Sequence, residues 1–177
     1  MIVERRTAFS CPWLDVVAKR VDLGPPRGEE VFWSVATPSD YTAVLAVTDD
    51  GLVPLVRLFR PALEAYVLEL PSGAVDPGEA PDVAARRELL EETGCAADEI
   101  VSLGMLFVDS GRMQTRQWGF FAPAARRGAA EPHGDEQLEL LFVPPEQLRG
   151  LLSGGELRLA PHVAIVCLAL AAGHLAL

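Results

Sequence analysis

The chain has 177 residues, of which half are hydrophobic and 23% are charged; this is the composition of a globular protein and excludes a disordered one. The length suits one domain, residues 1–177, that buries most of its apolar surface. The formal net charge of −10 and the lack of a basic patch exclude a nucleic-acid backbone as a partner. A small anionic substrate remains open, because a bound metal would reverse the local charge.

The cysteines and the apolar runs bear on localisation. Cys11, Cys95 and Cys167 are far apart and lack CxxC spacing, so we expect neither disulfides nor a zinc site. The first residues contain no apolar segment of the kind found in signal peptides. The longest apolar run, 163–172, has ten residues, which predicts a buried helix because it is too short to cross a bilayer. We therefore expect a cytoplasmic protein with no membrane partner.

Residues 1–36 predict a β-rich N-terminal extension. Segment 16–23 alternates imperfectly, 24–28 has the composition of a turn, and 30–37 is rich in β-formers, so the two segments predict a hairpin. Phe32 and Trp33 lie in the second strand. They are either core residues or an aromatic platform on which a base stacks.

Segments 41–48 and 52–60 flank Asp49-Asp50-Gly51, and the Asp-Gly pair predicts a hairpin between them. Arg57 and Arg60 are three residues apart, so they face opposite sides of a regular strand. Alternatively, each is a lone arginine on the protein surface. Arg60 ends its strand just before a proline, a position from which a planar guanidinium could clamp a phosphate.

The next segment, 66–73, predicts a strand that leads into a turn and a helix. Glu69 interrupts its apolar run, so it either faces outward on a sheet edge or turns into a polar site. Pro77-Gly78 marks a turn, Pro81 suits the first turn of a helix, and Gly94 suits the left-handed residue just past its end. These signals predict a helix over residues 81–93.

Three carboxylates share one face of this helix. Glu88, Glu91 and Glu92 stand at i, i+3 and i+4 and would repel one another without a positive charge nearby. Arg87 can reach Glu91, but one arginine does not balance four acids when Glu79 is counted. A Mg²⁺ ion would balance them, because it prefers oxygen ligands. The alternative is a solvated, charged helix face.

The rest of the chain predicts more strands and two helices. We expect strands at 99–111 and 116–124 around a polar loop, a long loop at 126–136 that ends in acids, and a strand at 138–144. Helices follow at 145–153 and 161–175. His162 and His174 are twelve residues apart near the ends of the last helix, which is not metal spacing, so both are interpreted as structural. Strands and helices interspersed in this way predict an α/β fold, a mixed sheet with helices on both faces.

The spacing of the central motif is specific. Gly73, five residues, Glu79, seven residues, and then the run 87–94, RELLEETG, resemble the signature of the Nudix hydrolases, which covers 73–95 here. The resemblance implies an α/β/α sandwich with a central mixed sheet. VRLFRP (56–61), LELPSG (68–73) and the acidic loop ending Asp135-Glu136 resemble the ADP-ribose and nucleoside-diphosphate-sugar pyrophosphatases.

One loop departs from that pattern. ADP-ribose hydrolases often have Ser-Pro-Gly where this chain has Asp109-Ser110-Gly111, and a glutamate where it has Gln114 or Gln117. Sugar nucleotides such as GDP-mannose or UDP-glucose therefore stay open beside ADP-ribose. The other readings are a nucleoside triphosphate pyrophosphatase, disfavoured by the N-terminal extension, and a non-catalytic ligand sensor, disfavoured by the intact motif.

The resemblance also implies roles for individual residues. The metal, Mg²⁺ or alternatively Mn²⁺, would be held by Glu88, Glu91 and Glu92 with the Gly73 carbonyl as a further ligand, and Arg87 would pair with Glu79. Glu92 would thereby take part in catalysis, and Glu136 would be the general base, with Asp135 or Glu131 as fallbacks. The substrate would be contacted by residues on several segments: Arg57, Arg60, Glu69, Arg112 and Arg116, and Phe32 and Trp33 across a homodimer.

Overall fold

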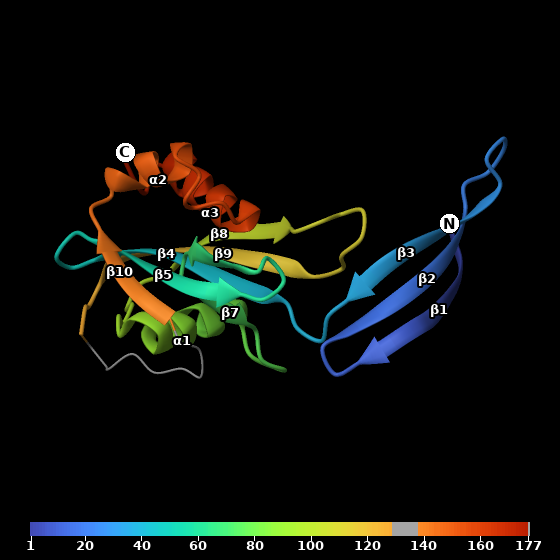
Figure 1. Ribbon diagram of the computed structural model, residues 1–177, viewed down its shortest axis with the longest axis horizontal. Helices are drawn as coiled ribbons and strands as arrows, with labels where there is room; N and C mark the ends of the chain where they lie inside the picture. Colours follow the sequence, from blue (N-terminus) through green and yellow to red (C-terminus); the bar gives the residue numbers. More distant parts are fainter. Residues whose placement is uncertain (129–137, 177) are drawn as a thin grey trace. The chain divides into compact units, whose positions relative to one another are not determined.

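The computed structural model describes residues 1–128 and 138–176 (Figure 1). Contacts within the chain divide it into two compact units. Unit 1 comprises Met1–Asp40 and Phe107–Arg116, and unit 2 comprises Tyr41–Leu106 and Gln117–Leu177.

The described residues form ten strands and three helices. In chain order these are β1 (Ile2–Cys11), β2 (Leu14–Asp22), β3 (Glu29–Ala36), β4 (Tyr41–Thr48), β5 (Val53–Arg60), β6 (Ala65–Glu69), β7 (Ser72–Ala74), α1 (Pro81–Thr93), β8 (Val101–Phe107), β9 (Arg116–Ala125), β10 (Leu138–Val143), α2 (Gln147–Ser153) and α3 (Ala160–Ala171). None of these helices is long and apolar enough to cross a membrane.

Unit 1 is a three-stranded antiparallel sheet in the order β1-β2-β3. The predicted hairpin is confirmed as β2 and β3. Strand β1, which the sequence did not indicate separately, pairs with β2 along its whole length. The loop between β8 and β9 belongs to this unit, because Val35 N–H donates to the Arg112 carbonyl (2.7 Å) and Gln114 N–H donates to the Val35 carbonyl (3.0 Å).

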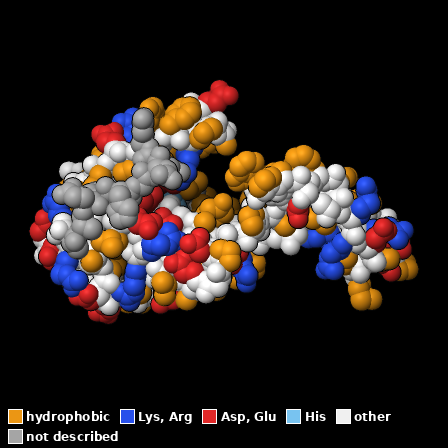
Figure 2. All heavy atoms as spheres, turned by 90° about the horizontal axis from the view of Figure 1, so that it is seen from below, with side chains coloured by type: hydrophobic (Ala, Val, Ile, Leu, Met, Phe, Trp, Pro, Cys, Tyr) orange, Lys and Arg blue, Asp and Glu red, His pale blue; other side chains and the backbone are white. Residues whose placement is uncertain are grey.

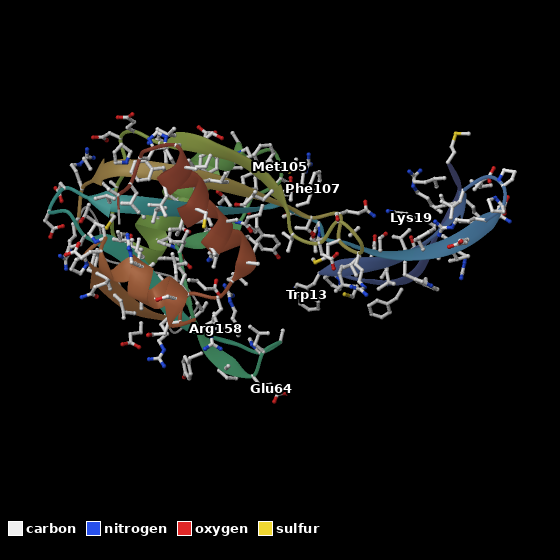
Figure 3. All side chains as sticks on the ribbon, turned by 90° about the horizontal axis from the view of Figure 1, so that it is seen from above. Trp13, Lys19, Glu64, Met105, Phe107 and Arg158 are labelled. Atoms are coloured by element: carbon white, nitrogen blue, oxygen red, sulfur yellow. The ribbon has the colours of Figure 1, made fainter. Side chains whose placement is uncertain are left out.

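Large apolar side chains of unit 1 lie on its surface (Figure 2). Phe32 is 41% exposed and Trp33 is 53% exposed, so their interpretation as core residues is wrong. The physical reason is that a three-stranded sheet without a covering layer within its own unit leaves both faces open. Trp13, in the turn between β1 and β2, is also exposed and lies at that end of the hairpin (Figure 3).

Unit 2 contains two sheets. One is antiparallel, in the order β10-β5-β6; the other is mixed, in the order β7-β4-β9-β8, with β4 antiparallel to β7 and parallel to β9. Helix α1 lies on one face, and α2 and α3 lie on the other (Figure 1). This confirms the prediction of a mixed sheet between helical layers.

Two predicted elements in unit 2 need correction. Asp49-Asp50-Gly51 does form a turn, closed by Thr48 N–H donating to the Leu52 carbonyl (2.7 Å), but β4 and β5 belong to different sheets and are not a hairpin. The strand predicted at 66–73 is divided at Leu70-Pro71 into β6 and β7, one in each sheet. In both places the chain passes from one sheet to the other.

The last helix is shorter than predicted. α3 ends at Ala171, because Gly173 takes a left-handed conformation (φ 73°) and His174 N–H closes the end by donating to the Ala169 carbonyl (2.9 Å). The ring of His174 stacks on Phe121. In the β5–β6 hairpin, Glu64 marks the tip (Figure 3).

Apolar side chains fill the space on both sides of the sheets. On the α1 side the buried cluster includes Val44, Leu89 and Phe120. On the α3 side it includes Leu45, Leu70 and Ile165. The two clusters fix α1 and α3 relative to β4, which lies between them and pairs with β7, the strand that contacts the acidic residues.

Candidate functional site

Helix α1 begins and ends where the sequence predicts. Pro81 is at its start, and Gly94 (φ 67°) ends it, with its N–H donating to the Leu90 carbonyl (2.9 Å). Leu89 and Ala85 are fully buried against the sheet. With that face committed to the core, the acidic side chains occupy the remaining sides of the helix.

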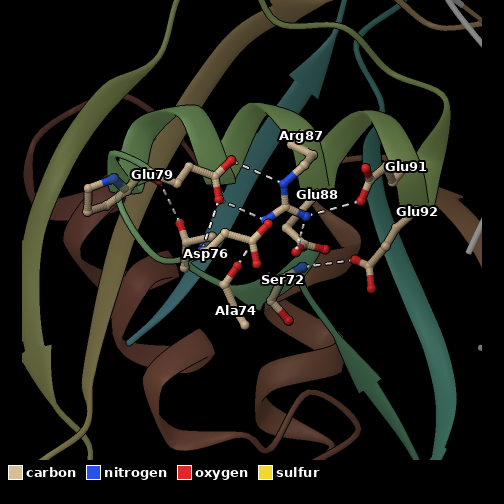
Figure 4. A network of polar contacts seen from close by, with 10 residues as sticks. Ser72, Ala74, Asp76, Glu79, Arg87, Glu88, Glu91 and Glu92 are labelled. Carbon is tan, nitrogen blue, oxygen red and sulfur yellow. Dashed lines mark hydrogen bonds and ion pairs between the residues drawn. The ribbon is translucent and has the colours of Figure 1, made fainter. Parts of the chain in front are cut away.

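Arg87 lies at the centre of the acidic cluster (Figure 4). It donates two hydrogen bonds to Glu79, at 3.1 and 3.0 Å, and one to the carbonyl of Ala74 at 2.9 Å. It also donates to Glu88 at 2.7 Å and to Glu91 at 3.1 Å. The predicted pairs of Arg87 with Glu79 and with Glu91 are both confirmed.

The charges in this cluster shift the pKa values of its members. Hydrogen bonds from Arg87 hold the pKa of Glu79 below its ordinary value, and the acids, Glu79 foremost, hold the pKa of Arg87 above its own. Burial raises the pKa of Glu88 even though Arg87 opposes the rise. One arginine therefore does not fully compensate the buried carboxylates, so an added cation would be favoured here.

Strand β7 closes the cluster from the other side. A Cβ atom on Gly73 would overlap the carboxylate of Glu88, so only glycine admits that carboxylate against the strand. Next to it, Ser72 N–H donates to Glu92 at 2.9 Å. The structure thus brings together Gly73, Glu79, Arg87, Glu88, Glu91 and Glu92, all of which the sequence had predicted as one site.

The donor set fits a hard divalent cation, which takes carboxylate and carbonyl oxygens. Arg87 binds Glu88 and Glu91, and the Ser72 N–H binds Glu92. In the part of the chain that the structure describes, no three acids, histidines or cysteines converge on one point. The fit therefore rests on the chemistry of the oxygens, on the close approach of the Glu88 carboxylate to Gly73, and on the net negative charge.

A second polar cluster lies at the end of β5. Both carboxylate oxygens of Glu69 accept hydrogen bonds from Arg60, at 2.8 Å each, and Glu69 is only 1% exposed. Of the two alternatives for Glu69, the structure thus shows the inward polar one. Arg57 faces the other side of the strand, as predicted, and pairs there with Glu139 at 3.6 Å.

His162, on α3, is buried beside this pair. Its Nδ1 accepts a hydrogen bond from Leu70 N–H at 3.1 Å. Burial lowers its pKa to about 4; Glu69 opposes this shift and Arg60 adds to it. The sequence indicated a structural histidine but not its contact, and the available signal was a polar residue at the start of a wholly apolar helix.

Four of the remaining predicted residues belong to the other compact unit. Phe32, Trp33 and Arg112 belong to unit 1, as does Arg116, whose side chain pairs with Asp40 at 3.0 Å. Arg112 lies 3.7 Å from Asp109. The predicted base Glu136 and its fallbacks Asp135 and Glu131 lie outside the described residues.

Comparison with known proteins shows the class of this fold and site. The NUDIX domain matches residues 38–163, and the chain belongs to this family. A solved structure described as an ADP compounds hydrolase superposes with a TM-score of 0.83 over 96% of this chain and 91% of that one, at 22% identity. That likeness confirms the predicted fold.

Among curated relatives, the ADP-ribose pyrophosphatase of Bacillus subtilis (strain 168) is 33% identical over 109 residues, which cover 62% of this chain and 58% of that protein. The GDP-mannose pyrophosphatase of Enterobacter sp. (strain 638) is 31% identical over 126 residues, 66% of this chain and 65% of that protein. The match with the ADP-ribose pyrophosphatase of Saccharomyces cerevisiae is 32% identical over 59% of this chain and 50% of that protein. The chain thus spans about half to two thirds of the length of these relatives.

Proposed function

We propose that this protein hydrolyses the diphosphate linkage of a nucleoside diphosphate joined to another moiety, with ADP-ribose or a nucleotide sugar as substrate. The observation that carries this proposal is a cluster of four carboxylates, of which Arg87 binds Glu79, Glu88 and Glu91 and the Ser72 N–H binds Glu92. Relatives named ADP-ribose pyrophosphatase and GDP-mannose pyrophosphatase support the substrate class.

The ligands proposed for a divalent cation, Mg²⁺ or alternatively Mn²⁺, are Glu88, Glu91, Glu92 and the Gly73 carbonyl. When bound, such a cation neutralises charge on the diphosphate and acidifies the attacking water. The raised pKa of Glu88 and the excess of acids over Arg87 are consistent with this role.

The chain's own residues would do the rest of the work. Arg87 holds Glu79 and Glu91 in place and keeps the acids from repelling one another apart. Arg60, at the end of β5, donates two hydrogen bonds to Glu69. These bonds fix the position of a guanidinium that is suited to contact a diphosphate. A water attacking phosphorus needs a base to take its proton, and Glu136 is proposed for that role.

We extend the proposal to the assembly and the compartment. A cytoplasmic homodimer is proposed, in which Phe32 and Trp33 contribute to the nucleotide pocket of the other protomer. Their exposure in unit 1 is consistent with such a contact. Light scattering at micromolar concentration measures the assembly, and a monomer would contradict it.

A substrate panel tests the activity. The protein is incubated with Mg²⁺ and ADP-ribose, GDP-mannose, UDP-glucose, a dinucleoside polyphosphate or a nucleoside triphosphate, and the phosphorylated products are identified. Two monophosphates from ADP-ribose, or a nucleoside monophosphate and a sugar phosphate from a nucleotide sugar, are expected. Pyrophosphate from the triphosphate alone would instead favour a triphosphate pyrophosphatase, and binding without turnover would favour a sensor.

A further inference from the structure

The chain passes between the two sheets of unit 2 at Leu70-Pro71. Glu69 is the last residue of β6 and pairs with Val56 of β5, whereas Ser72 is the first residue of β7 and pairs with Ala43 of β4. The Pro71 carbonyl accepts from Val44 N–H at 3.0 Å, and proline itself has no N–H. The N–H of Leu70 therefore lies at a crossing where neither sheet supplies its acceptor.

An imidazole on α3 supplies it. Leu70 is fully buried, and its N–H donates to Nδ1 of His162, which is 2% exposed, at 3.1 Å. A buried N–H left without an acceptor would cost about 1–3 kcal/mol. Because Nδ1 accepts, the ring is neutral with its proton on Nε2, a state that its depressed pKa favours at neutral pH.

The crossing is held on its other side by the Arg60–Glu69 pair. Glu69 directly precedes Leu70, and its two oxygens are fixed by Arg60 at 2.8 Å each. Two neighbouring residues are thus anchored to β5 and to α3. The four residues that follow Glu69 have little freedom to move, because Pro71 restricts the backbone as well.

Those four residues reach the carboxylate site. Ser72 N–H holds Glu92 at 2.9 Å, and Gly73 lies against the carboxylate of Glu88 with no room for a further atom. A shift of the crossing by a fraction of an ångström would lengthen the first contact and change the second. Metal ligands are sensitive to such shifts, because the residues that orient them determine their geometry.

We infer that His162 is a positioning residue for the carboxylate site: by accepting the Leu70 N–H it fixes Ser72 and Gly73 against Glu92 and Glu88, and so determines how tightly the site binds a divalent cation. The inference rests on the proposed function. It assigns to the helix on the far side of the sheet a role in the chemistry of α1.

Binding of Mn²⁺, followed by electron paramagnetic resonance on the folded protein, tests this inference without substrate. His162→Phe keeps a ring of similar size but removes the acceptor, and His162→Leu does so with a smaller side chain in case the phenyl ring prevents folding. Both should bind Mn²⁺ about 10–100-fold more weakly, the usual range for residues that support metal ligands. His162→Asn, whose amide oxygen can occupy the position of Nδ1, should recover most of the loss.

A matched control separates positioning from general loosening. Val166 is fully buried one turn further along α3, and Val166→Ala should lower the free energy of unfolding without changing Mn²⁺ affinity. Wild-type Mn²⁺ affinity in His162→Phe and His162→Leu would overturn the inference but leave the proposed function intact. An equal loss of Mn²⁺ affinity in Val166→Ala would do the same. If the wild type itself binds no Mn²⁺, the metal site of the proposed function fails and the inference fails with it.

Discussion

Replacing Arg87 by methionine tests whether the acids of α1 depend on an internal cation. The Arg87 side chain makes five hydrogen bonds, four of them to Glu79, Glu88 and Glu91, and is 29% exposed. Methionine keeps much of the apolar stem and removes the charge. Three partly buried carboxylates would then face one another with no arginine between them.

The expected loss follows from the burial of these groups. Removing one partner of a buried ion pair costs about 3–5 kcal/mol, and the partial exposure of Arg87 screens the pair, so we expect a loss of about 2–3 kcal/mol in the free energy of unfolding. Urea titrations at pH 7 in the presence of a chelator measure this loss without interference from bound metal.

Arg57→Met is the matched control in the same unit. Arg57 pairs with Glu139 at 3.6 Å, and both side chains are more than half exposed, so its replacement should cost about 1 kcal/mol or less. If Arg87→Met unfolds with the same free energy as Arg57→Met, the acids do not depend on Arg87 and the reasoning is refuted.

Two further predictions concern Gly73 and His162. Gly73→Ala places a methyl group on the Glu88 carboxylate, so the folded variant should bind Mn²⁺ and turn over substrate at least about tenfold less well. The pKa of His162 is about 4 in the folded protein and 6.5 ordinarily, so the unfolded chain takes up its proton first as pH falls. The contribution of neutral His162 to the free energy of unfolding is therefore complete above pH 6.5 and decreases towards pH 4, by up to about 3 kcal/mol. Of the charged groups that face the ring, Glu69 makes this decrease smaller and Arg60 makes it larger.

Each of these predictions has its own control. Gly150 lies in α2 with open space around it, so Gly150→Ala should leave metal binding and turnover unchanged, and an equal effect of both alanines would contradict the role of Gly73. For His162 the comparison is His162→Leu, measured by urea titration from pH 4 to 7. Parallel pH profiles of wild type and variant would show that this imidazole does not titrate on unfolding.

The acidic site was predictable from sequence because its determinants are local. Helix α1, its left-handed Gly94 and the contacts of Arg87 with Glu79 and Glu91 depend on residues within one loop and one helix. Spacing along a helix fixes which side chains share a face, so the pattern determines the cluster.

What the sequence did not reveal depends on distant partners. The turn at Asp49-Asp50-Gly51 forms as predicted, yet its flanking strands join different sheets, because sheet partners are chosen by long-range packing and not by the turn. Strand β1 has no apolar alternation and becomes a strand by pairing with β2. The bond between Leu70 and His162 joins residues 92 apart, which no local pattern indicates.

The carboxylates of α1 are proposed to carry out metal-dependent hydrolysis of a nucleoside diphosphate derivative. The most direct test of this proposal compares wild type with Glu92→Gln on ADP-ribose at saturating Mg²⁺, with the products identified and the fold of the variant checked by circular dichroism. The wild type should release AMP and ribose 5-phosphate, and the folded variant should be at least about a hundredfold slower, because a lost metal ligand costs several kcal/mol of transition-state stabilisation. Near-normal turnover by Glu92→Gln would contradict the assignment of this site.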